Sequence, residues 1–135
     1  FHSFVIQSKK EGKFNEIMHT NRKIGEKGES IAAQFLLDKG FVIVERNWRT
    51  GHKEIDLICK QADIYIFVEV KTRRNKNFGN PEESINIAKQ DHIKKAAMGF
   101  VSENENYSDH DLRIDVISIL LVEGKAEIEH FENAF

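Results

Sequence analysis

The sequence predicts an α/β domain in which a mixed β-sheet of about five strands is flanked by helices, in the order α-β-β-β-α-β-β. Two stretches, residues 21–39 and 82–103, carry apolar residues at the spacing of an amphipathic helix. The segments between and after them are short, apolar and bounded by turn-forming residues, which is typical of strands. A mixed sheet with helices packed against it buries all of these apolar faces.

The first helix is predicted over residues 21–39, and Gly40 supplies its natural stop. Residues 41–44 then indicate a buried strand that continues toward Trp48, with a turn near residues 50–51. The other expected elements are strands 54–60 and 64–72 joined by a turn at 61–63, a loop at 75–81, a helix at 82–103, a loop at 104–111, and strands 112–122 and 125–131.

The length of 135 residues suits a single domain with a real core. The helical pattern begins only after Met18, so we take residues 18–135 as this domain and residues 1–17 as an N-terminal extension of uncertain structure. Cys59 is the single cysteine, which excludes an internal disulfide framework and favours a reducing, cytoplasmic compartment. No apolar stretch reaches the roughly 18 residues that a membrane helix needs.

The net charge of −2 argues mildly against strong nucleic-acid binding, because proteins that depend on phosphate contacts are usually basic. The local distribution differs from this average. Lys71, Arg73, Arg74 and Lys76 lie within six residues of one another. Such a run is most often a solvated loop, but this one directly follows a predicted strand with unusual acidic residues.

In that strand, Glu69 and Lys71 share one face, because side chains alternate along a strand. Taken alone, this pair is more often a strand-end salt bridge than a site. Asp56 lies 13 positions before Glu69, across a tight turn, so a hairpin would bring the two carboxylates together. Two adjacent carboxylates need a shared proton or a cation, and oxygen ligands suit Mg²⁺ or Mn²⁺ better than zinc.

Glu29 is a third candidate acid for this site. It projects inside the apolar arc of the first predicted helix. An inward acid is an informative exception, although a capping or snorkelling residue is an equally frequent explanation. Lys89 shows the same anomaly in the second helix. Three acids and a lysine have a coherent use: the acids hold metal that activates water at a phosphate, and Lys71 orients that water or stabilises the developing charge.

Asp56 with Glu69-Val70-Lys71 resembles the signature of the restriction-endonuclease-like superfamily, with Ile55 where proline often precedes the aspartate. More specifically, the chain resembles the YraN family of predicted endonucleases, which are related to archaeal Holliday-junction resolvases. The matching segments run in order from residue 24 to the end: residues 25–29 with Ala32, 47–49, 54–58, 67–73, Gly79, Lys89, 113–117 and 133–135. Lys53 departs from the pattern, since the family usually has glycine there.

The resemblance implies a restriction-endonuclease-like mixed sheet and a phosphodiesterase site. In that site Glu29, Asp56, Glu69 and Lys71 are catalytic, and the metal positions are Glu29, Asp56, Glu69 and Val70. Arg73, Arg74, Lys76 and Lys89 are then the expected nucleic-acid contacts.

Two classes of function remain open at this point. The first is a metal-dependent endonuclease that hydrolyses phosphodiester bonds in DNA, including branched or recombination intermediates; sequence does not separate DNA from RNA. The second is a non-catalytic nucleic-acid-binding or partner-binding module on the same fold, since fold does not settle function. A chain of this size needs a homodimer to span a junction.

Overall fold

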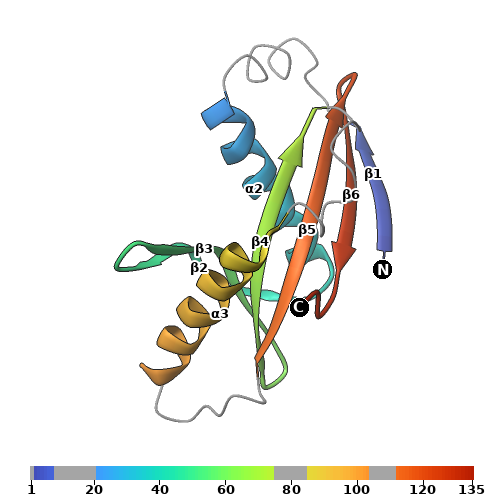
Figure 1. The fold of residues 1–135 in the computed structure, drawn as a ribbon. Coiled ribbons are helices and arrows are strands. Elements are labelled where there is room, and N and C mark those ends of the chain that lie inside the picture. The colour runs from blue at the N-terminus through green and yellow to red at the C-terminus, as the bar shows by residue number, and fades with distance from the viewer. Residues whose placement is uncertain (1, 8–20, 75–84, 104–111) are drawn as a thin grey trace.

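The computed structural model describes residues 2–7, 21–74, 85–103 and 112–135, which form six strands and two helices (Figure 1). The elements are β1 (His2–Gln7), α2 (Asn21–Asp38), β2 (Val42–Thr50), β3 (Lys53–Gln61), β4 (Ile64–Arg73), α3 (Ile87–Ser102), β5 (Leu112–Val122) and β6 (Lys125–Phe131). The α/β class and the predicted order of elements from α2 to β6 are confirmed.

The strands form one mixed sheet in the order β1-β6-β5-β4-β3-β2. Among the described strand pairs, β4 and β5 are parallel and the other pairs are antiparallel. Parallel neighbours require a crossover connection, and α3 lies in the connection from β4 to β5. The five predicted strands are therefore present, and β1, in the segment set aside as an extension, adds a sixth at the β6 edge (Figure 1).

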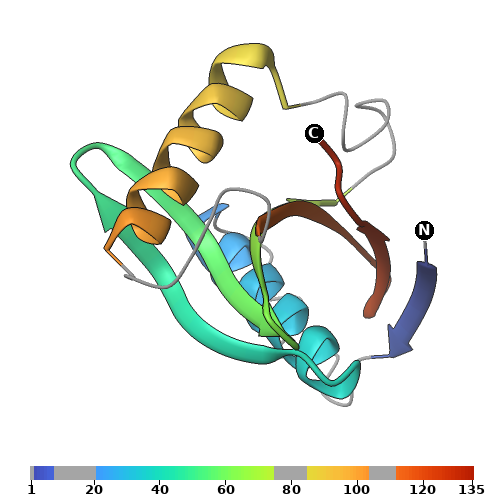
Figure 2. The same ribbon diagram turned by 90° about the horizontal axis from the view of Figure 1, so that it is seen from below.

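The two helices cover opposite faces of the sheet (Figure 2). On one face, Phe35 and Leu36 of α2 pack in a cluster with Val68 of β4. On the other face, Ile93 and Phe100 of α3 pack in a second cluster with sheet residues. Strand alternation explains how one strand serves both clusters. Among the described residues, neither helix is long and apolar enough to cross a membrane.

Strand β2 differs from the expectation of a buried strand. It lies at the edge of the sheet and pairs only with β3 among the described strands. Val42 is 61% exposed and Val44 is 37% exposed. The prediction was wrong because a run of apolar residues does not reveal whether a strand has neighbours on one side or on two.

Helix α3 begins at Ile87, later than the predicted start at residue 82. Asn86 has an extended backbone, and its side chain accepts a hydrogen bond from the backbone N–H of Lys89 at 2.8 Å. This is the N-cap arrangement that satisfies a free amide of the first turn. Residues 82–84 lie outside the described residues.

The β2–β3 hairpin turns away from β4 (Figure 1). The β3–β4 ladder ends at the pair of Leu57 with Val68. Leu57 packs on the α2 face, whereas Ile55 belongs to the cluster on the α3 face. Strict alternation along a strand would place residues 55 and 57 on the same face, so β3 departs from regular geometry between them. Beyond this change of face, β3 and β4 no longer pair with each other.

Candidate functional site

A cavity of about 310 Å³ lies where β3 separates from β4. Helix α2 and strands β3 and β4 supply its lining, and three of the lining side chains are acids. The lining residues are Ile24, Gly25, Glu29, Asp56, Glu69, Val70, Thr72 and Arg74. The cavity therefore combines carboxylates from three elements with one arginine.

Asp56 and Glu69 form the centre of this site. Their carboxyl groups are hydrogen-bonded to each other. Asp56 Oδ2 also accepts a hydrogen bond from the backbone N–H of Val70 at 2.8 Å. This contact fixes the Asp56 carboxyl just beyond the end of the β3–β4 ladder. Glu69 is only 6% exposed and Asp56 is half-buried, so Glu69 is the more shielded of the two acids.

Burial, and to a lesser extent the adjacent negative charge of Asp56, raise the pKa of Glu69 to about 7. The positive charges of Lys89 and Lys71 act in the opposite direction. Burial also raises the pKa of Asp56, against hydrogen bonds from Val70 and Glu69. Both carboxyls therefore hold a proton more readily than a free acid does, as expected for acids that share one small space.

Helix α2 places Glu29 beside this pair. Burial raises the pKa of Glu29, and the charge of Asp56 raises it as well, while a hydrogen bond from Asn47 lowers it. Gly28 sets the position of this part of the helix. A Cβ atom at residue 28 would lie 1.8 Å from the Thr72 hydroxyl oxygen, so glycine allows α2 to approach β4 closely.

The predicted basic residues occupy different positions. The Nζ atom of Lys89 lies 3.5 Å from Oε1 of Glu69, so α3 places a positively charged side chain beside the acid pair. Lys71 acts on Glu69 through its charge and does not line the cavity. Arg74 lines the cavity and Arg73 precedes it at the end of β4. Lys76 lies outside the described residues.

Asn47 and Glu54 belong to the same constellation, although the sequence pattern did not identify them as site residues. Asn47 lies opposite Asp56 in the β2–β3 ladder, between the pairs of Arg46 with Leu57 and Trp48 with Ile55. With its amide nitrogen facing the acids, Asn47 donates to Glu29 and to Glu54. No periodic pattern marks such a residue, because its role depends on the bend that brings β2 to α2.

The donors of this site are suited to a hard divalent cation. All three acidic side chains offer oxygen, and Mg²⁺ is commonly bound through one or two carboxylates while it keeps several waters. The shared hydrogen bond between Asp56 and Glu69 marks the place where a cation would replace a proton. Among the described residues, no three His, Cys, Asp or Glu side chains converge on a single point. Asp56 and Glu69 thus fit as the principal ligands, with Glu29 behind them.

A second charged cluster lies on the α2 face, around the buried residues Asp115 and His130. Asp115 accepts hydrogen bonds from His130 at 2.7 Å, from Arg113 at 2.9 Å to each oxygen, and from the backbone N–H of Asn133. Burial would raise the pKa of Asp115, but these hydrogen bonds outweigh it and lower the pKa. Since its acceptors are all engaged, this cluster stabilises the fold rather than offering an open site.

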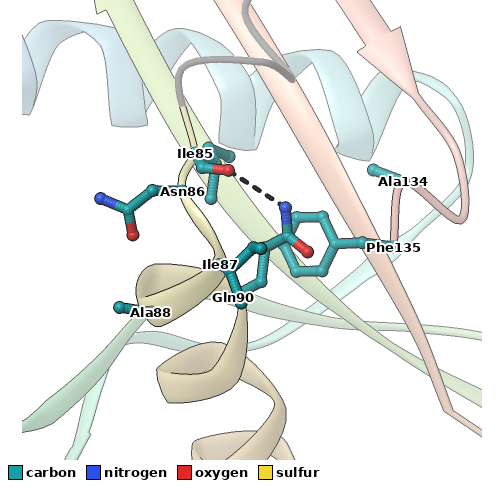
Figure 3. A pocket seen from close by; sticks show the side chains of 7 residues that line it. All are labelled: Ile85, Asn86, Ile87, Ala88, Gln90, Ala134 and Phe135. Carbon is teal, nitrogen blue, oxygen red and sulfur yellow. Dashed lines mark hydrogen bonds between the residues drawn. The ribbon is translucent and has the colours of Figure 1, made fainter.

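Two other features lack the chemistry of a phosphate or metal site. A hollow of about 760 Å³ at the start of α3 has no charged side chain among the described residues that line it, and Gln90 there already donates to the carbonyl of Ile85 at 3.1 Å (Figure 3). The thiol of Cys59 is buried, and burial together with the charge of Asp115 raises its pKa to about 12. A thiol of this kind is not a nucleophile at neutral pH.

Comparisons with known proteins place the chain beside a bacterial family. The family described as "Uncharacterised protein family UPF0102" matches residues 28–119. A UPF0102 protein of Syntrophomonas wolfei is 44% identical over 115 residues, covering 85% of this chain and 99% of that protein. A UPF0102 protein of Chloroherpeton thalassium is 46% identical over 108 residues, covering 80% and 83%.

Among solved structures, the chain is similar to one described as Pyrococcus furiosus SfsA in complex with Ca²⁺. The two share 18% sequence identity with a TM-score of 0.40. The similarity covers 82% of this chain and 63% of that chain.

Proposed function

Since the chain belongs to the uncharacterised protein family UPF0102, the YraN family that its motifs resemble, we propose that it is a metal-dependent endonuclease that hydrolyses phosphodiester bonds in DNA. The observation that carries this proposal is the carboxyl pair formed by half-buried Asp56 and buried Glu69 at the separation of β3 from β4. Two acids held together in this way are a prepared site for a divalent cation.

Asp56 and Glu69 would hold Mg²⁺ or Mn²⁺ in this proposal, with the position of Val70 beside them and Glu29 as the outer acid. Bound metal would supply an activated water and neutralise charge on the scissile phosphate. The backbone N–H of Val70 orients the Asp56 carboxyl, so Asp56 would need little reorganisation to serve as a metal ligand.

The basic residues have separate tasks. Lys71 orients the attacking water or stabilises the developing negative charge. Lys89 balances the charge of Glu69 through its contact at 3.5 Å. Arg74 at the cavity and Arg73 beside it, with Lys76 farther along the chain, serve as phosphate contacts that position the DNA.

A second candidate is a non-catalytic nucleic-acid-binding module on the same fold. The observation that favours it is that, within the described part of the chain, no three metal-ligating side chains converge on one point. A module of this kind would keep the basic residues as phosphate contacts and use the acids only structurally.

The experiment that decides between the two candidates incubates purified protein with supercoiled, single-stranded and branched DNA and with structured RNA. Mg²⁺ or Mn²⁺ is supplied or removed with a chelator, and strand cutting is measured by gel electrophoresis. Wild type should cut DNA only with metal. Asp56→Asn and Lys71→Ala should each lose about 100-fold or more in rate, whereas Glu45→Gln, at an exposed position on β2, should retain the wild-type rate.

Binding of DNA by wild type without any metal-dependent cutting would reject the endonuclease and support the binding module. Faster cutting of RNA than of DNA would assign the same chemistry to a different substrate. A homodimer, which a branched substrate requires of so small a chain, should appear as a concentration-dependent mass in analytical ultracentrifugation.

A further inference from the structure

Asn47 connects two acidic side chains that come from different elements. Its amide nitrogen lies 3.2 Å from Oε2 of Glu29 and 3.1 Å from Oε1 of Glu54. Only the amide orientation that turns nitrogen toward these oxygens pairs a donor with an acceptor at both contacts. One uncharged donor group therefore bridges Glu29 of α2 and Glu54 of β3.

The backbone of Asn47 makes this residue type unusual for a strand. Its φ angle is 50°, in the left-handed region that glycine adopts freely and that asparagine and aspartate tolerate best among the other residues. Glycine has no side chain to contribute, and aspartate would bring a further negative charge to the acids. Asparagine combines this backbone conformation with an uncharged N–H donor.

The second acid in the bridge has a further partner. Oε2 of Glu54 lies 3.5 Å from Nη2 of Arg49, so both oxygens of Glu54 have a partner. Arg49 and Glu54 face each other across the β2–β3 ladder, two positions beyond Asn47 and Asp56. The β2–β3 hairpin thus positions Asn47, and the hydrogen bond from Asn47 in turn positions the Glu29 carboxylate.

We propose that Asn47 is a positioning residue that holds the Glu29 carboxylate toward Asp56, so that the acids are arranged for a divalent cation before it binds. This inference rests on the proposed metal-dependent function. It assigns no contact between Asn47 and the metal or the DNA. Outer residues that orient a ligating carboxylate typically change metal affinity or activity 10- to 100-fold when they are removed.

Asn47→Gly is the informative variant, because it keeps the left-handed backbone and removes only the amide. Asn133→Gly is its matched control, since Asn133 has a φ angle of 51° and does not line the acidic cavity. Each protein is titrated with Mn²⁺ in the absence of nucleic acid, with free Mn²⁺ followed by electron paramagnetic resonance. The kcat and KM for DNA cutting and the free energy of unfolding are measured alongside.

We expect Asn47→Gly to weaken Mn²⁺ binding about 10-fold and to lower kcat while KM for DNA stays within about twofold. Asn133→Gly should bind Mn²⁺ like wild type. In metal-free protein, the side-chain amide resonances of Asn47 should move in the Glu29→Gln variant, which reports the hydrogen bond directly by NMR.

Wild-type Mn²⁺ affinity in Asn47→Gly, or an equal loss in Asn133→Gly, would overturn the positioning role while leaving the endonuclease intact. Amide resonances of Asn47 that do not respond to Glu29→Gln would overturn the bridge itself. Absence of Mn²⁺ binding and of DNA cutting in wild type would instead reject the proposed function, and the positioning role with it.

Discussion

Two glycines of α2 differ in whether a neighbouring side chain leaves room for a Cβ atom. Gly28 faces β4, where a Cβ atom would lie 1.8 Å from the hydroxyl oxygen and 2.9 Å from the Cβ of Thr72. Gly25, three residues earlier, has no such neighbour within 4 Å of a Cβ atom. Since Glu29 directly follows Gly28, the absent side chain at residue 28 helps to set how close this acid lies to β4.

We predict that Gly28→Ala destabilises the fold and Gly25→Ala stabilises it. Alanine gains roughly 1 kcal/mol over glycine inside a helix, and at Gly25 nothing opposes that gain. At Gly28 the contact with Thr72 forces α2 and β4 apart, at a cost of about 1–3 kcal/mol. Urea unfolding of both variants checks this, and equal stability changes at the two positions would contradict the close packing.

Asp115 is a single residue on which several buried groups depend. It is fully buried and accepts hydrogen bonds from His130, Arg113 and the backbone of Asn133. Asp115→Asn places an amide group against these donors, and breaking a buried charged pair costs about 3–5 kcal/mol.

The matched acid-to-amide control for Asp115→Asn is Glu132→Gln. The Glu132 side chain is 42% exposed, and its cationic partners lie 3.8 and 4.0 Å away. Exposed pairs of this kind contribute less than about 1 kcal/mol. Chemical denaturation should therefore separate the two variants clearly, and similar losses in both would contradict the assigned role of Asp115.

At the scale of elements, the N-cap of α3 determines where its first turn lies, and that turn carries Lys89. Asn86→Ala should destabilise the protein by about 1 kcal/mol, because it removes the acceptor for the backbone N–H of Lys89. Asn86→Asp retains the acceptor and should stay close to wild type. Thermal unfolding of the two variants tests this, and equal stability for both would show that the cap is not used.

Elements with strong local signals were predictable from sequence. Gly40 ends α2 with a φ angle of 90°, and Glu123 and Gly124 turn β5 into β6 with φ angles of 52° and 75°. The bounds of β5 and β6 agree with their predicted ranges. In these cases the residues that determine the structure are adjacent in the chain, so pattern and turn chemistry suffice.

Features decided by distant partners were not predictable in the same way. The exposure of β2 depends on its place at the sheet edge, and the face of Ile55 depends on the bend at Asp56 and Asn47. Asp56 and Glu69 were expected to meet because one short hairpin joins their strands. Asn47 was missed because its contact with Glu29 joins an edge strand to a helix, which requires the fold itself.

At the scale of the whole molecule, the acids around Glu69 and the cluster around Asp115 respond oppositely to pH. The raised pKa of Glu69 means that the folded state favours its protonated form. That contribution to stability is present below pH 4.5, the ordinary pKa, and is lost as pH rises toward about 7. The raised pKa values of Asp56 and Glu29 act in the same direction. Asp115, with a lowered pKa, stabilises the fold above its ordinary value of 3.8 and loses this effect in acid.

We therefore predict that the metal-free protein loses stability between about pH 5 and pH 8, by on the order of 2–3 kcal/mol from Glu69. Urea unfolding in the presence of a chelator measures this slope. Glu69→Gln should flatten it, because glutamine cannot ionise, while Glu45→Gln at an exposed position should follow wild type. Mg²⁺ should reduce the wild-type loss, since a bound cation stabilises the ionised pair by mass action. An unchanged slope in Glu69→Gln would show that this carboxyl pair does not hold the proton that the cation is proposed to replace.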